Sequence, residues 1–226
     1  MSSRFFNGYL GVAVILLVVA VHSSLGVAAT PPPDICNVPL GKSAVEVGWD
    51  HLTSGKAMLA EAEYSGARMS LTKALACFES DFDHNQQAVA EVLDALEDVM
   101  IFEGRYQEAE KNARRSLAIR RKLYPEAEYP DGHEEIVSAL NQLAEALFYV
   151  DKSAAAKSIS EEAVRLSRRL FGPNDPRLAD SLEMLAEILR ALAQPGEKEG
   201  YEEGVRLLAE ALQIRQHQHD QTGGAA

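Results

Sequence analysis

The chain has 226 residues, of which 46% are apolar and 25% are charged, a balance that is ordinary for a folded protein. That length allows one or two domains with a real hydrophobic core. The formal net charge is −12. This charge argues against a nucleic-acid partner, which usually requires a basic patch or stripe, and argues less strongly against an anionic membrane surface.

Residues 1–29 have the pattern of a secretory signal peptide. Arg4 supplies a positive charge, an apolar run extends from Leu10 to Val21, and Val27 and Ala29 occupy the −3 and −1 positions of a cleavage site. The apolar run is shorter than the roughly 20 residues of a membrane span, which favours cleavage. We therefore expect an exported protein, secreted or periplasmic, with membrane anchoring by an uncleaved N-terminal segment as the alternative.

Residues 30–42 are expected to form a linker, because their prolines disfavour helix and favour extended structure. Cys36 lies in this linker and Cys77 lies in the helical region that follows. An oxidising compartment permits a disulfide between two such cysteines. A buried free thiol at Cys77 is the alternative, and the sequence does not decide between them.

From Ser43 onward the sequence predicts helices. Leu, Ala, Glu, Arg and Lys dominate, apolar residues recur at spacings of three and four, and no segment alternates with a period of two. The breaks at glycine and proline group the helices in pairs. The expected pairs are 43–60 with 64–80, 87–103 with 106–123, 132–149 with 153–170, and 176–193 with 199–218. Residues 219–226 are expected to be a disordered tail.

Small residues recur at equivalent places in these pairs, once on the first helix and twice on the second. They are Gly55, Ala67 and Ala74; Ala109 and Ser116; Ala144, Ala156 and Ala163; and Ala186, Gly204 and Ala211. Helices that approach closely leave no room for long side chains where they cross, so these residues are predicted to pack the pairs together. Glu97 is the exception, which implies either looser packing of the second pair or a slip in the alignment there.

The recurring unit resembles the tetratricopeptide repeat, in the longer subtype found in kinesin light chains and many bacterial proteins. The resemblance is carried by "GRYQEAEKNARRSLAI" (104–119), "SALNQLAEAL" (138–147) and "LFGPNDPRLADSLEMLAEIL" (170–189). Self-similarity at a fixed period of this size is typical of solenoids. The resemblance implies an all-α, right-handed solenoid of about four helical hairpins over residues 43–218.

The sequence contains no motif that predicts catalysis. It has no glycine-rich phosphate loop, no Gly-x-Ser-x-Gly elbow and no His-Glu-x-x-His pair. "HQHD", at 217–220, is the one metal-like cluster, and a polar helix end, where the helix dipole favours histidine, is the preferred interpretation. We therefore expect a non-enzymatic protein without a cofactor or a metal.

The resemblance also implies that the first helix of each pair lines a concave groove that binds a peptide. The groove residues that it predicts are Glu91, Asp94, Asp98, Asn141, Glu145, Asp180, Glu183 and Glu187, with Phe148 and Tyr149 as apolar anchors. The family subtype often carries an asparagine at the place of Asn141, where it holds a peptide backbone. The acidic lining is expected to select a basic or polar segment. Ordinary solvated surface acids in an acidic protein are the other interpretation.

The predicted function is therefore an exported interaction scaffold that binds a peptide or protein segment in this groove. One alternative is a self-associating structural module and possible homo-oligomer, because the ends of a solenoid expose apolar faces. The other is a membrane-anchored assembly factor.

Overall fold

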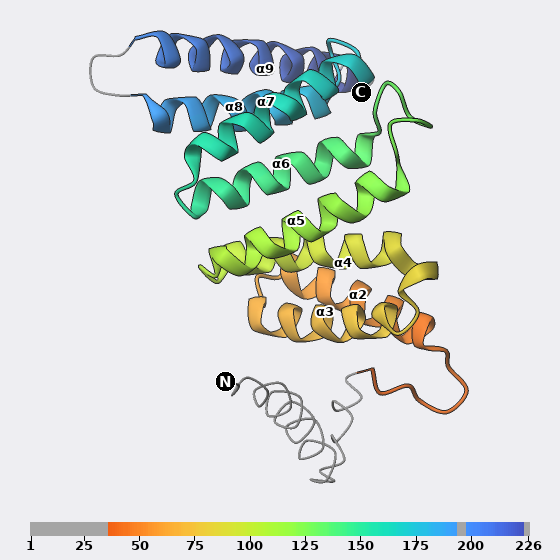
Figure 1. Ribbon diagram of the computed structural model, residues 1–226. Coiled ribbons are helices and arrows are strands. Elements are labelled where there is room, and N and C mark those ends of the chain that lie inside the picture. Colours follow the sequence, from red (N-terminus) through yellow and green to blue (C-terminus); the bar gives the residue numbers. More distant parts are fainter. Residues whose placement is uncertain (1–35, 194–197, 224–226) are drawn as a thin grey trace, which may run out of the picture. The chain divides into compact units, whose positions relative to one another are not determined.

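The computed structural model describes residues 36–193 and 198–223, and in these ranges the chain forms helices and no strand (Figure 1). The helices are α2 (Ala44–Ala60), α3 (Tyr64–Glu79), α4 (Phe82–Phe102), α5 (Tyr106–Leu123), α6 (Glu134–Tyr149), α7 (Ser153–Leu170), α8 (Pro176–Leu192) and α9 (Glu199–Gly223). The all-α prediction is confirmed. The predicted signal peptide, residues 1–29, lies outside the described residues. Within them, no helix is both long and apolar enough to span a membrane.

The helix bounds agree with the sequence prediction except at two places. Helix α4 begins at Phe82, several residues early, because a short helical turn precedes Asn85, whose φ of −121° departs from helical geometry. Helix α9 continues to Gly223, so positions 219–223 extend the last helix. The prediction of a disordered tail from position 219 was wrong for these residues.

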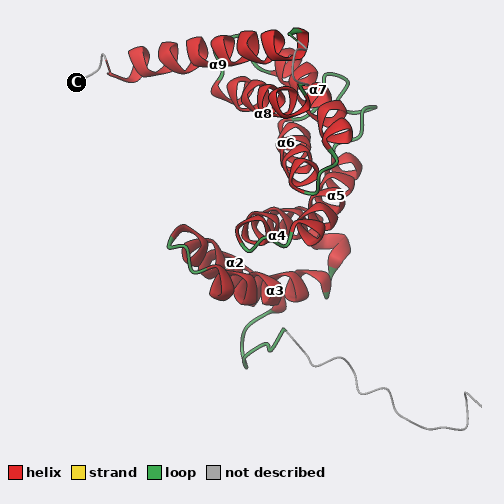
Figure 2. Ribbon diagram, turned by 90° about the vertical axis from the view of Figure 1, so that its left-hand side faces the viewer, coloured by secondary structure: helices red, strands yellow, loops and turns green. Residues whose placement is uncertain are grey.

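The helices stack as four consecutive hairpins. Contacts join α2 with α3, α4 with α5, α6 with α7 and α8 with α9, and the second helix of each hairpin also contacts the first helix of the next. The first helices contact one another in turn, α2 with α4, α4 with α6 and α6 with α8. In Figure 2 these four helices lie along the inner side of the arc that the hairpins form, and α3, α5 and α7 lie outside.

The turns inside the first three hairpins share one backbone geometry. Ala62, Gly104 and Asp151 have positive φ values of 60°, 73° and 60°. The N–H of the residue after Gly104, Arg105, donates to the carbonyl oxygen of Met100 at 2.8 Å, and the other two turns make the equivalent bond. This hydrogen bond satisfies a carbonyl at the end of each first helix and turns the chain back on itself.

The small residues predicted to pack the hairpins are all buried. At Gly55 an added Cβ would lie 2.6 Å from Cγ of Leu71, so the two helices meet too closely there for a side chain. Glu97 is also buried, with no exposed surface, and its partners Ala109 and Ser116 are equally buried. The second hairpin therefore keeps both its alignment and its close packing, and it encloses the glutamate.

A disulfide joins Cys36 to Cys77, whose Cα atoms lie 4.9 Å apart. Both residues are buried, together with Val47 of α2. The bond therefore attaches the segment before α2 to α3 and closes a loop across a sequence separation of 41.

Removing this disulfide is expected to lower the free energy of unfolding by about 2–4 kcal/mol, because the unfolded chain regains the freedom of the closed loop. Urea unfolding of the oxidised protein and of the Cys36→Ala/Cys77→Ala variant measures the difference. The reduced wild-type protein is the control and should unfold like the variant. Equal stability of all three samples would contradict the prediction.

Candidate functional site

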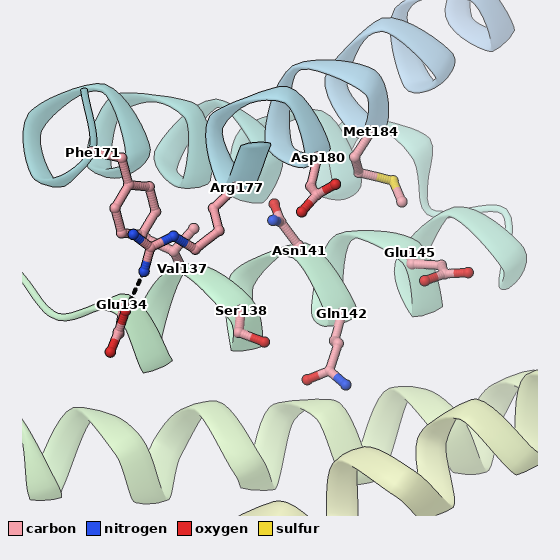
Figure 3. A pocket seen from close by; sticks show the side chains of 10 residues that line it. All are labelled: Glu134, Val137, Ser138, Asn141, Gln142, Glu145, Phe171, Arg177, Asp180 and Met184. Atoms are coloured by element: carbon pink, nitrogen blue, oxygen red, sulfur yellow. Dashed lines mark hydrogen bonds and ion pairs between the residues drawn. The ribbon is translucent and has the colours of Figure 1, made fainter. Parts of the chain in front are cut away.

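A partly open cavity of about 380 Å³ lies between helices α6 and α8 on the inner side of the solenoid (Figure 3). Residues three and four apart on α6 share the face that forms one wall, and α8 with the loop before it forms the other. The cavity is lined by Glu134, Val137, Ser138, Asn141, Gln142, Glu145, Phe171, Arg177, Asp180 and Met184.

Arg177 closes one end of this cavity. Its guanidinium carbon lies 3.9 Å from the centre of the Phe171 ring, a cation–π arrangement. The guanidinium also donates to Asp175 Oδ2 at 2.8 Å and to Glu134. Its charge is therefore already compensated within the chain, and the arginine positions the wall of the cavity.

Asn141 and Gln142, which line the cavity, each have one buried oxygen atom without a hydrogen-bond partner. Asn141 donates through Nδ2 to Ser181 Oγ at 3.0 Å, which fixes the orientation of the amide. The oxygens Asn141 Oδ1 and Gln142 Oε1 are buried and accept no hydrogen bond. A buried acceptor without a donor costs free energy.

Three carboxyl groups gather beside this cavity, on α4 and α6. We call Glu97, Asp98 and Glu145 the Glu97 cluster. Burial, reinforced by the carboxylates of Asp98, Glu145 and Asp94, raises the pKa of Glu97 to about 9. Burial and the neighbouring Glu145 and Asp94 carboxylates raise the pKa of Asp98 to about 6, and burial and Glu187 raise the pKa of Glu145. Glu97 is therefore protonated at neutral pH, although neither of its oxygens has a hydrogen-bond partner.

Two of the predicted groove acids on α4 are engaged by the chain's own cations. Asp94 Oδ2 lies 2.5 Å from Arg120 Nη2, and its other oxygen accepts a hydrogen bond from Ser116 Oγ at 2.6 Å. Glu91 forms an ion pair with Lys56 of α2. Asp94 and Glu91, which are predicted to line the groove, thus also link α4 to α5 and to α2, and their part in ligand binding stays a prediction.

Two of the predicted groove acids on α8 also form ion pairs within the chain. Arg215 of α9 donates to Asp180 Oδ1 at 2.6 Å and to Glu183 Oε1 at 3.0 Å. Glu187, one turn further along, is exposed, and Arg190 lies 4.0 Å away. The acidic surface of α8 is thus partly neutralised by α9.

The predicted apolar anchors differ in accessibility. Phe148 is partly buried and packs against the hydrophobic core. Tyr149 is 42% exposed and stacks on Tyr106, with the ring centres 5.1 Å apart. Only Tyr149 therefore offers a broad apolar surface at the end of α6.

The sequence reasoning missed most of the side chains from α8 and the preceding loop that line the cavity. Gln142 and Val137 could have been found, because they lie within one helical turn of Asn141 on α6. Phe171 and Arg177 could not, because their contact depends on how the loop before α8 folds back. The described residues include no group of three or more His, Cys, Asp or Glu that could hold a metal ion.

Two family models, both described as tetratricopeptide repeats, match the chain, one over residues 103–133 and the other over residues 135–197. No curated protein matches. Among solved structures, one similar chain contains the nearly identical TPR-like repeats of a Podosopora anserina protein described as a kinesin light chain. It is 17% identical, with a TM-score of 0.60, and the match covers 90% of this chain and 85% of that chain.

A form of the same repeats that carries one substitution is 16% identical, with a TM-score of 0.60 and coverage of 95% and 87%. BtubC (BKLC) from P. vanneervenii is 13% identical, with a TM-score of 0.66 and coverage of 81% of this chain and 69% of that one. At these identities the likeness concerns the fold. The chain therefore carries tetratricopeptide repeats within residues 103–197, and its solenoid is like that of kinesin-light-chain repeat proteins.

Proposed function

We propose that the protein is an exported, non-enzymatic scaffold that binds a polar or basic segment of another protein along the inner face of α4, α6 and α8. Tetratricopeptide repeats generally mediate protein–protein interactions, and their solenoids offer extended concave surfaces for this purpose. The observation that carries the proposal is the cavity between α6 and α8, whose lining includes Asn141 and Gln142, two amides that each keep one oxygen without a hydrogen-bond partner.

The cavity and its surroundings support an extended segment as the ligand. Its lining includes carboxylates and amides, whose oxygens can act as acceptors, and a peptide backbone supplies N–H donors along its length. The net charge of −12 favours a partner of opposite charge through steering and orientation. The signal-peptide pattern and the disulfide between Cys36 and Cys77 support export, since disulfides persist mainly in oxidising compartments.

Self-association through α9 is the second candidate. Large apolar side chains on one face of this last helix are exposed: Tyr201, Val205, Leu208 and Leu212. Ala113 and Leu117, which occupy the places of Leu208 and Leu212 in the repeat of α5, are buried. A further helix, from a second copy of the chain, would cover the apolar face of α9 in the same manner.

Peptides selected from a random displayed library on the immobilised protein would test the groove. We expect the Asn141→Ala/Gln142→Ala variant to bind the selected peptides at least about tenfold more weakly, because two hydrogen bonds are lost. The control is Gln107→Ala, which removes an exposed amide from the outer helix α5. Circular dichroism checks that all variants are folded. Unchanged binding of the selected peptides to the double variant would contradict the proposed groove. If no peptide is selected and the protein is found only as a dimer, self-association is favoured.

A further inference from the structure

Glu97 is the one carboxyl group, among the residues whose surroundings the structure describes, that is buried with both oxygens lacking a hydrogen-bond partner. A long acidic side chain stands where the other hairpins have glycine or alanine, and the hairpin nevertheless closes around it. Leaving such a group unsatisfied costs free energy without improving the packing. A role in binding would account for its presence.

Among the described residues, the neighbours that shift the pKa of Glu97 are acids, and the cation Lys56 acts on the pKa of Asp98. Asp94 and Asp98 on the same helix and Glu145 on α6 all raise the pKa of Glu97. Two cations of the described part of the chain form ion pairs beside these acids: Lys56 of α2 pairs with Glu91, and Arg120 of α5 pairs with Asp94.

Asp98 and Glu145 are only partly buried, so they form the accessible edge of the Glu97 cluster and Glu97 lies deeper. Glu145 also lines the cavity between α6 and α8, as Figure 3 shows, which joins the cluster to the proposed peptide surface. Asn141 and Gln142, which also line that cavity, each have an oxygen without a hydrogen-bond partner. The ligand that suits this whole wall carries several N–H donors and a positive charge.

We propose that the Glu97 cluster is a subsite for one cationic side chain, an arginine or a lysine, of the bound segment. The inference rests on the proposed function for the source of that side chain. The cation approaches over Asp98 and Glu145, and Glu97 beneath them gives up its proton and completes the neutralisation of the charge. Guanidinium and ammonium groups supply several N–H donors to carboxylate oxygens, which makes such hydrogen bonds stronger than neutral ones.

Proton release gives the subsite a recognisable signature. Near neutral pH Glu97 is protonated, so binding of a cation to its carboxylate must displace a proton. The affinity is therefore expected to rise with pH between about 6 and about 8, by up to tenfold per pH unit for one proton released. A surface that attracts cations through ionised acids alone would lose this dependence once those acids are deprotonated.

The test uses N-acetyl-arginine methylamide as the probe. The control compound is N-acetyl-citrulline methylamide, which has a similar shape but no charge. Carboxyl ¹³C resonances of the full protein are followed during each titration. We expect the arginine probe to shift the resonances of Glu97, Asp98 and Glu145, and the citrulline probe to leave them unchanged. The variant Glu97→Gln keeps the size of the side chain and should remove the pH dependence, whereas Glu128→Gln, at an exposed site outside the inner face, should not.

Equal shifts with both probes, equal shifts at Glu128, or a pH dependence that survives Glu97→Gln would each overturn the subsite. The outcome is separable from that of the peptide selection. If the selected peptides need Asn141 and Gln142 for binding but contain no basic residue, the peptide groove is supported and the cation subsite is contradicted. If the Glu97 cluster responds to the arginine probe but no peptide is selected, the cation subsite is supported and the peptide groove is contradicted.

Discussion

Replacing Glu97 with glutamine is expected to stabilise the free protein by about 3 kcal/mol at pH 7, and the gain should approach about 6 kcal/mol near pH 9. Glutamine fills the same space as the protonated acid, so packing changes little. The difference comes from the unfolded chain, where an exposed glutamate ionises freely and a glutamine does not. Near pH 9 this is the largest effect on stability that we expect from one side chain.

The direction follows from the two pKa values. In the folded protein the pKa of Glu97 is raised from 4.5 to about 9. Below the lower value both states are protonated and the group contributes no pH dependence. Between the two values the unfolded state loses its proton while the folded state keeps it, so the wild-type protein loses stability as the pH rises, at about 1.4 kcal/mol per unit. Above the higher value the loss is complete.

Urea unfolding of wild type and Glu97→Gln at about pH 5, 7 and 8 measures the effect. The two proteins should be similar at the lowest pH and should diverge steadily as the pH rises. Glu128→Gln is the matched control, because it changes the same chemical group at an exposed site. A constant difference between wild type and Glu97→Gln at all three pH values would show that the side chain does not keep its proton in the folded state.

Much of the fold could be predicted from the sequence, because the helical period and the small residues repeat in every hairpin. Gly55, Ala144 and Ala186 occupy equivalent places and are all buried. The early start of α4 was missed because Asn85 interrupts its first turn. Glu97 was noticed as an exception, but the sequence does not show that a buried carboxyl group can keep its proton and be tolerated there.

The site was predicted less well, because the position of a residue on a helix does not show which cation reaches it. Asp98 and Asp94 lie on the same helix and were expected to share one role. The structure places Arg120 against Asp94, whereas burial and neighbouring acids surround Asp98. The contact between Arg120 and Asp94 spans 26 positions of sequence and two helices, so it depends on how the hairpin closes.

Two positions of the repeat face each other across the two helices of a hairpin. The first lies three residues before the position of Glu97 or Ala186 on the first helix, and the second lies four residues after Ser116 or Ala211 on the second helix. In the second hairpin Asp94 and Arg120 occupy them, and in the fourth Glu183 and Arg215 form the same pair. The two pairs differ in exposure. The Arg120 side chain is 7% exposed and the Arg215 side chain is 41% exposed.

This difference predicts unequal effects of the same substitution. Arg120→Met is expected to lower the free energy of unfolding by about 3–5 kcal/mol, because the nearly buried Asp94 carboxylate loses its counter-charge. Arg120 also pairs with Glu135 of α6 at 2.9 Å, so the variant loosens the second hairpin from the third. Arg215→Met removes an exposed pair and should cost less than about 1 kcal/mol.

Urea unfolding of both variants, with the Arg120→Met/Asp94→Leu double variant, separates charge from packing. The double variant should recover much of the stability that Arg120→Met loses, because no carboxylate is then left unpaired in the hairpin. Equal losses for Arg120→Met and Arg215→Met, or no recovery in the double variant, would mean that the arginine acts through its packed methylenes and not through its charge. Recovery would show that Asp94, although it lies on the inner helix, serves the fold, which leaves ligand binding to the acids that no arginine reaches.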